Sequence, residues 1–83
     1  MRIPRGVSAR DLMKGLKQFG YEPSRQNGSH IRVTTQSGGQ HHVTIPNHSE
    51  IRVGTLSAIL SDISSHLKIT KDELVSLVFF NQK

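Results

Sequence analysis

The residues best suited to chemistry in this sequence are its histidines, because imidazole is the side chain whose unperturbed pKa lies nearest neutral pH. Five are present: His30, His41, His42, His48 and His66. His30 differs from the others because it follows the turn signal Asn27-Gly28-Ser29 and begins a segment in which polar and apolar residues alternate. A side chain on the polar face of such a strand reaches solvent, while the hydrogen-bond ladder holds its backbone in place.

Two arginines are expected beside His30. If Asn27 and Gly28 form a two-residue hairpin turn, Arg25 pairs with His30 across the turn, and Arg32 lies two residues further along the same face. Guanidinium groups would hold a phosphate next to the imidazole. This suits RNA cleavage by transesterification, in which a base removes the 2′-hydroxyl proton and cations stabilise the charge of the transition state. The same pattern also fits an exposed strand histidine without a catalytic task.

Other kinds of site have less support. A metal site could combine His48 with His41 or His42, but adjacent strand residues point to opposite faces, so only one of that pair could join it. Gly38-Gly39 is not followed directly by a helix, which excludes a P-loop. The carboxylates are scattered over predicted caps and loops, and cysteine is absent, so neither a paired-carboxylate hydrolase nor a thiol site is expected. We therefore expect no metal and no cofactor.

The overall charge favours a polyanionic partner such as nucleic acid. Lys and Arg total 11 against 6 Asp and Glu, giving a formal net charge of +5 at pH 7. The length of 83 residues predicts a single domain over residues 1–83. The sequence shows no apolar stretch long enough for a signal peptide or a membrane span, and without cysteine it needs no oxidising compartment, so we expect a cytoplasmic location.

The first predicted element is a helix from Ser8 to Gly20. Ser8 and Asp11 form a capping-box pattern, and apolar residues then recur at helical spacing until the glycine. Cationic residues repeat on the opposite face of this helix: Arg10, Lys14 and Lys17. This stripe either contacts a phosphate backbone or is an ordinary solvated face.

Three strands are predicted next, at Tyr21 to Gln26, Ser29 to Thr35 and His41 to Ile45. The apolar faces of the second and third coincide if Val33 lies opposite Val43. That register leaves a five-residue loop between these strands and places His42 opposite Thr34. Pro23 cannot donate to a ladder, which predicts that the first strand lies at an edge of the sheet.

Two further helices complete the predicted fold. Apolar residues at helical spacing after residue 53 indicate the first (Leu56, Ile59, Leu60 and Ile63), and the capping box Thr70-Lys71-Asp72-Glu73 begins the second. The order α-β-β-β-α with an extra C-terminal helix predicts an α+β fold in two layers. Helices would cover one face of a three-stranded antiparallel sheet and leave the other face open to water.

Four motifs in this order resemble the HicA toxin family, also called YcfA-like mRNA interferases. They are Gly15-Leu16-Lys17-Gln18-Phe19-Gly20-Tyr21, Arg25-Gln26-Asn27-Gly28-Ser29-His30, Val43-Thr44-Ile45-Pro46, and Gly54-Thr55-Leu56 with Ile59-Leu60. The similarity covers residues 8–60, and the combined order and spacing are more specific than any one motif.

The resemblance implies a fold like that of a double-stranded-RNA-binding domain, with a core at residues 8–66 and a helical extension at 67–83. It implies a type II toxin that is a metal-independent endoribonuclease, cleaving mRNA without the ribosome, with His30 as the catalytic residue. It also implies a HicB-type antitoxin that covers the histidine face. DNA would be contacted only indirectly, through the antitoxin complex.

We accordingly expect His30 to act as general acid or base. The side chains expected to contact RNA are Lys14, Lys17, Arg25, Ser29, Arg32 and His42. Among these, His42 is also the nearest candidate for a second proton carrier.

The sequence departs from the family in two places. Ile31 follows His30 where many members have an aromatic residue or a histidine, and the extension at 67–83, led by Phe79 and Phe80, forms either a cap on the core or an interface. Two other functions stay open from the residues alone. One is a non-catalytic RNA-binding module, and the other is a protein-interaction subunit whose C-terminal helix is the functional element.

Overall fold

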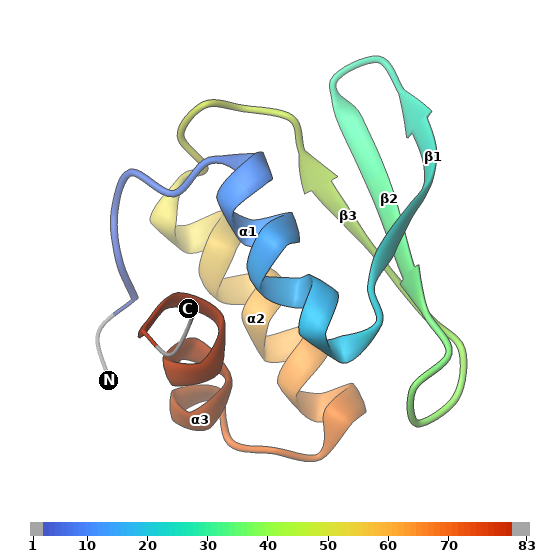
Figure 1. Ribbon diagram of the computed structural model, residues 1–83. Helices are drawn as coiled ribbons and strands as arrows, with labels where there is room; N and C mark the ends of the chain where they lie inside the picture. The colour runs from blue at the N-terminus through green and yellow to red at the C-terminus, as the bar shows by residue number, and fades with distance from the viewer. Residues whose placement is uncertain (1–2, 81–83) are drawn as a thin grey trace.

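The computed structural model describes residues 3–80 and has helices on one side of a small sheet. The elements in order are α1 (Ala9–Leu16), a 3-10 turn η1 (Lys17–Phe19), β1 (Glu22–Asn27), β2 (His30–Thr35), β3 (His41–Pro46), α2 (Val53–Leu67), α3 (Lys71–Val75) and a π-helical turn η2 (Ser76–Phe80). The strands form one antiparallel sheet in the order β1-β2-β3. Helices α1 and α2 cover one of its faces, and α3 packs beyond them, away from the sheet (Figure 1). The predicted α+β, α-β-β-β-α layout is confirmed.

The pairing of β2 with β3 follows the predicted register. Val33 lies opposite Val43, and Thr34 lies opposite His42. Along β2 the burial alternates, so that Ile31 faces the helices while its neighbours on the other face are exposed. The register is fixed because a shift by one residue would turn every apolar side chain of these strands to water.

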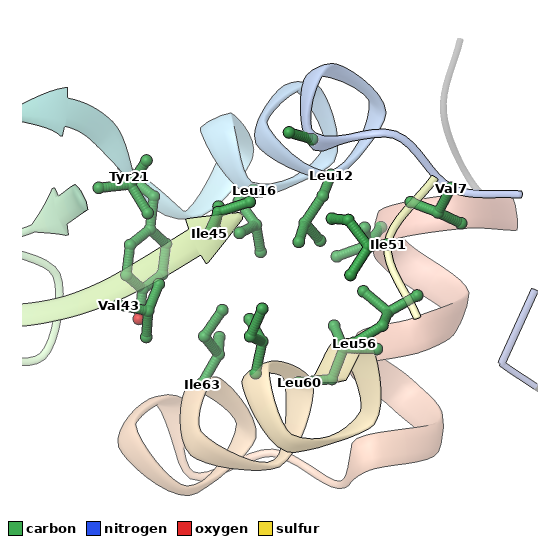
Figure 2. Packing of buried hydrophobic residues seen from close by; sticks show 14 of the residues in the cluster. Val7, Leu12, Leu16, Tyr21, Val43, Ile45, Ile51, Leu56, Leu60 and Ile63 are labelled. Atoms are coloured by element: carbon green, nitrogen blue, oxygen red, sulfur yellow. The ribbon is translucent and has the colours of Figure 1, made fainter. Parts of the chain in front are cut away.

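The hydrophobic core lies between the sheet and the two long helices. Tyr21 and the buried side chains of α1, β3 and α2 converge on it (Figure 2). Its largest fully buried aliphatic members include Leu12, Leu16, Ile45, Ile51, Leu56, Leu60 and Ile63. Apart from Tyr21 this core is built from aliphatic residues, so its stability comes from many small apolar areas.

The C-terminal segment closes the far side of the core. Leu74, Val75 and Val78 are buried in the same cluster. The Gln18 side chain donates through Nε2 to the Leu77 carbonyl oxygen at 2.9 Å, which fastens η2 to the end of α1. These contacts make residues 67–80 of the extension a cap on the core, while residues 81–83 lie outside the described range. Phe80 is 59% exposed.

The turn between β1 and β2 differs from the prediction by one position. The turn residues are Gly28 and Ser29, so Asn27 pairs with His30, and the expected Arg25–His30 pair is wrong. Of the two, only Gly28 has a positive φ, 62°. A loop with glycine at its first position needs just one such residue, whereas an Asn-Gly loop needs two in succession.

Strand β1 contains an irregularity that the sequence did not reveal. The pairing moves from Pro23 opposite Val33 directly to Arg25 opposite Arg32, which leaves Ser24 as an extra residue. The extra residue shifts the alternation of faces by one position, so that Arg25 lies opposite the exposed Arg32. As predicted for a proline-containing strand, β1 is an edge of the sheet, and all of its residues are exposed.

None of the helices within residues 3–80 is both long and apolar enough to cross a membrane.

Replacement of Gly20 by alanine should destabilise the fold. Gly20 has φ of 85°, and a Cβ there would lie 2.8 Å from Thr35 Oγ1. That hydroxyl is held by the Phe19 carbonyl and the Ser37 amide, so it cannot move aside cheaply. We expect the free energy of unfolding, measured with urea, to fall by at least about 1–2 kcal/mol.

Gly54→Ala is the matched control. Gly54 lies in α2, where an added Cβ meets no atom within 4 Å. Alanine should there raise the free energy of unfolding by about 0.5–1 kcal/mol. Equal effects of the two substitutions would contradict the description of Gly20.

Candidate nucleic-acid interface

The open face of the sheet carries His30 at the start of its central strand. The residue pairs with Asn27 on β1 and Pro46 on β3, so its backbone is held from both sides. The Asn47 amide adds a hydrogen bond of 2.6 Å to the Ser29 carbonyl at the same end of the sheet. The side chain of His30 is exposed and makes no hydrogen bond to any other residue of the described range 3–80. The backbone is therefore fixed, while the imidazole is available to a ligand.

A shallow hollow of 270 Å³ surrounds this imidazole. Its lining consists of Arg25, Asn27, His30, Arg32 and Thr44, with no carboxylate among them. Both arginines lie near His30 as predicted, but the strand pairing differs. Arg25 lies opposite Arg32 and not opposite His30. Asn27 and Thr44 were not predicted as site residues. The predicted pairing of Val33 with Val43 sets Thr44 opposite Arg32, as in the structure, whereas Asn27 was expected in the turn.

The opposed arginines are an unfavourable pair in the unliganded sheet. Arg25 and Arg32 are direct cross-strand neighbours, and like charges at such positions repel. Neither forms an ion pair with a carboxylate in residues 3–80. A bound anion such as phosphate would relieve this repulsion.

A second and larger hollow, of 460 Å³, occupies the other half of the open face. It shares Arg25 and Arg32 with the first. Its other lining residues are Glu22, Pro23, Ser24, Thr34, Gln36, Gln40 and His42. His30 and His42 thus stand at opposite ends of one surface, with the arginine pair between them.

A chain of hydrogen bonds holds His42. The hydroxyl of Ser24 lies 2.7 Å from that of Thr34, which lies 2.7 Å from Nδ1 of His42. Ser24 also donates to the Arg32 carbonyl at 3.3 Å. Ser24, the extra residue of β1, therefore helps to fix the orientation of the exposed His42 imidazole on β3.

The remaining predicted RNA contacts lie away from the histidine hollow. Lys14 and Lys17 line a third hollow between α1 and the beginning of β1, together with Tyr21 and Pro23. Ser29 is exposed in the turn and lines none of these hollows. The structure thus brings Arg25, Arg32 and His42 together on the open face. Lys14 and Lys17 lie apart from them, in the hollow beside α1.

The three histidines considered for a metal site are separated. His41 lies beneath the sheet, His42 lies on the open face, and His48 is in the loop after β3. Within residues 3–80, no three His, Cys, Asp or Glu side chains are grouped so that they could hold a metal ion.

The profile of one known family matches this chain over residues 9–64, a segment that runs from α1 into α2 and includes His30. That family is described as the HicA toxin of bacterial toxin-antitoxin systems. The protein belongs to the HicA toxin family. Neither a curated protein nor a solved structure gave a match. In this HicA-family chain the C-terminal helix α3 and the turn η2 lie beyond the matched segment.

A second group of polar side chains joins the sheet to α2 on the covered side of this HicA-family fold. The Tyr21 hydroxyl lies 2.8 Å from Nδ1 of His41, whose Nε2 lies 3.2 Å from Asp62 Oδ1. The ring of His66 stacks on that of His41 with centroids 4.3 Å apart. His66 Nε2 in turn lies 2.9 Å from the Ser37 carbonyl. All of these contacts are internal, which indicates a structural role.

Tyr21 provides a pH-dependent test of this group. Burial raises the pKa of its hydroxyl to about 12 from 10.0, and the charge of Asp62 adds to the effect. Between pH 10 and about pH 12 the unfolded chain releases the tyrosine proton while the folded chain retains it, so the free energy of unfolding should fall as pH rises. We expect the wild type to lose about 2 kcal/mol more over this range than Tyr21→Phe does.

The measurement is direct because the chain has one tyrosine and no tryptophan. Near-ultraviolet absorbance should report phenolate formation near pH 12 in the folded protein, with urea unfolding followed in parallel. An absorbance change centred at the ordinary value of tyrosine, before unfolding begins, would contradict the buried environment.

Proposed function

We propose that this HicA-family protein is an endoribonuclease that cleaves mRNA, with His30 as the catalytic residue. The observation that carries the proposal is an exposed imidazole that has no hydrogen-bond partner within residues 3–80 and lies in a hollow whose charged lining residues from that range are Arg25 and Arg32. Family membership supports it, because the family is one of toxins. An mRNA substrate also implies action in the cytoplasm.

The proposed reaction is transesterification within one strand. The ribose 2′-oxygen attacks the adjacent phosphorus while its proton passes to a base, and the bond from phosphorus to the 5′-oxygen breaks as that oxygen gains a proton. The products are a cyclic phosphate and a free 5′-hydroxyl. His30 accepts or donates one of these protons, and the guanidinium groups of Arg25 and Arg32 stabilise the negative charge that grows on the phosphoryl oxygens.

We further propose that a HicB-type antitoxin neutralises the protein by covering the open face of the sheet. The family description names a toxin-antitoxin pair, and the open face is the side of the sheet that α1 and α2 leave uncovered (Figure 1). A protein seated there would exclude RNA from both hollows and would pair acidic groups with the two arginines.

Substitution of His30 should separate cleavage from stability. His30→Ala removes the proton carrier, so we expect the cleavage rate of purified protein on mRNA to fall by about a hundredfold to ten-thousandfold. Its exposed side chain makes no internal hydrogen bond within residues 3–80, so the melting temperature should stay close to that of the wild type. Wild-type cleavage should persist in EDTA.

His48→Ala is the control, since His48 is also exposed but lines neither hollow. Full cleavage by His30→Ala would refute the assignment. If the wild type binds RNA without ever producing fragments, the protein is a non-catalytic RNA-binding module instead.

The arginine pair predicts a distinct result. Arg25→Ala and Arg32→Ala should each weaken RNA binding at low salt and reduce the slope of log K against log salt by about 1. Because each removes a like-charge repulsion, neither should lower the melting temperature. Arg52→Ala, which changes the same charge at the start of α2, should leave the slope unaltered. Fluorescence anisotropy with a labelled RNA gives the slopes, and an unchanged slope in both test variants would contradict phosphate binding between them.

A further inference from the structure

The two hollows on the open face differ in chemistry. Among residues 3–80, the hollow around His30 is lined by cationic and neutral polar side chains, which suits a phosphate. The larger hollow includes the carboxylate of Glu22, which would repel a phosphate. Glu22 forms no hydrogen bond or ion pair within residues 3–80, so its oxygens are free to accept from a ligand.

The hydrogen bonds of Ser24, Thr34 and His42 run in one direction. Ser24 donates its single hydroxyl proton to the Arg32 carbonyl, so its oxygen accepts from Thr34. The Thr34 oxygen then accepts from Nδ1–H of His42. This arrangement alone satisfies all three contacts. In the neutral imidazole, this leaves Nε2 of His42 as a hydrogen-bond acceptor on a residue that lines the hollow.

The hollow therefore presents acceptors and donors at separate places. Glu22 and Nε2 of His42 accept, while the exposed side-chain amides of Gln36 and Gln40 can donate. The planar guanidinium groups of Arg25 and Arg32 form its border with the first hollow and can stack on an aromatic ring. A ring with adjacent N–H donors and a carbonyl acceptor is complementary to this set.

The larger hollow lies too far along β2 from His30 for His42 to act on the same phosphate. His42 lies opposite Thr34, four residues from His30, which corresponds to about 13 Å along the strand. Two proton carriers on one phosphodiester must both reach it, so His42 does not serve as the partner of His30. Stacked nucleotides rise about 3.4 Å each, so the hollow lies within about four nucleotides of the phosphate held at His30.

We propose that the hollow formed by Glu22, Gln36, Gln40 and His42 is a nucleobase subsite that selects guanine. The N1–H and N2 amino groups of guanine would donate in parallel to the Glu22 carboxylate, and its O6 would accept from a glutamine amide. Uracil has a single N–H between two carbonyl groups and would place one of them against the carboxylate. The proposal rests on the proposed function, because it names the RNA feature that the same surface recognises.

Short synthetic RNAs test the subsite. In a series of octamers, every base is uracil except one guanine, which is moved stepwise along the strand. Wild-type cleavage gives kcat/KM, and His30→Ala, which is expected to bind without cutting, gives Kd by anisotropy. We expect guanine at one position to improve both values by about tenfold to a hundredfold relative to the all-uracil RNA.

Two substitutions show whether Glu22 and His42 cause the preference. Glu22→Gln should reduce it to within twofold, yet bind all-uracil RNA at least as tightly as before, because a negative charge has been removed. His42→Ala should also weaken the preference, because the second hydrogen of the guanine N2 amino group would lose Nε2 of His42 as its acceptor. Glu50→Gln and His48→Ala make the same chemical changes at exposed loop positions and should retain it. Circular dichroism and melting temperatures check that each variant is folded.

The outcomes separate this inference from the nuclease proposal. Cleavage with no guanine preference, or with a preference that survives both Glu22→Gln and His42→Ala, overturns the subsite and leaves the nuclease intact. A Glu22-dependent guanine preference in binding, without cleavage by the wild type, supports the subsite and overturns the nuclease. Absence of both cleavage and preference overturns both.

Discussion

The alternation of side chains along the central strand β2 governs the rest of the molecule. Ile31, Val33 and Thr35 are buried against the helices, so His30 and Arg32 must lie on the open face. Neighbouring strands pair with β2 on both sides, which fixes the backbone beneath each exposed side chain. A one-residue slip would bury the imidazole and expose the core, so the energy that holds the fold together also positions the candidate site.

The open face combines features that a purely structural surface would avoid. It opposes Arg25 to Arg32 across two strands, and it keeps Glu22 without a partner in residues 3–80. The arginine pair costs stability in the free protein, and a bound anion would relieve this repulsion, whereas the exposed Glu22 carboxylate is hydrated and remains able to accept hydrogen bonds from a ligand. The repelling arginines and the free carboxylate therefore lie in the two hollows. The covered side shows the opposite behaviour, since Tyr21, His41 and Asp62 satisfy one another and join the sheet to α2.

The C-terminal elements show how a small domain enlarges its core. A sheet of three strands with two helices buries limited apolar area, and Leu74, Val75 and Val78 add to it from the side that the sheet does not reach. These residues lie beyond the segment matched by the HicA family profile. Within residues 3–80, both hollows are lined by residues of β1, β2, β3 and the loop between β2 and β3, and the described part of the extension lines neither.

The sequence by itself determined the order of the elements, the pairing of Val33 with Val43, and the exposure of His30, because apolar alternation has a period of two and a buried face admits one register. It also indicated the charge of the partner. The sequence predicted Arg25 and Arg32 beside His30, but only the tertiary structure decided that they lie opposite each other and that Asn27 pairs with His30, because the turn uses Gly28 and Ser29 and β1 carries an extra residue at Ser24. The position of the turn and the extra residue in β1 both depend on backbone angles and cross-strand packing, which the residue types do not specify locally. The hydrogen bonds from Ser24 through Thr34 to His42 join residues far apart in sequence, and they arise only when three strands come together.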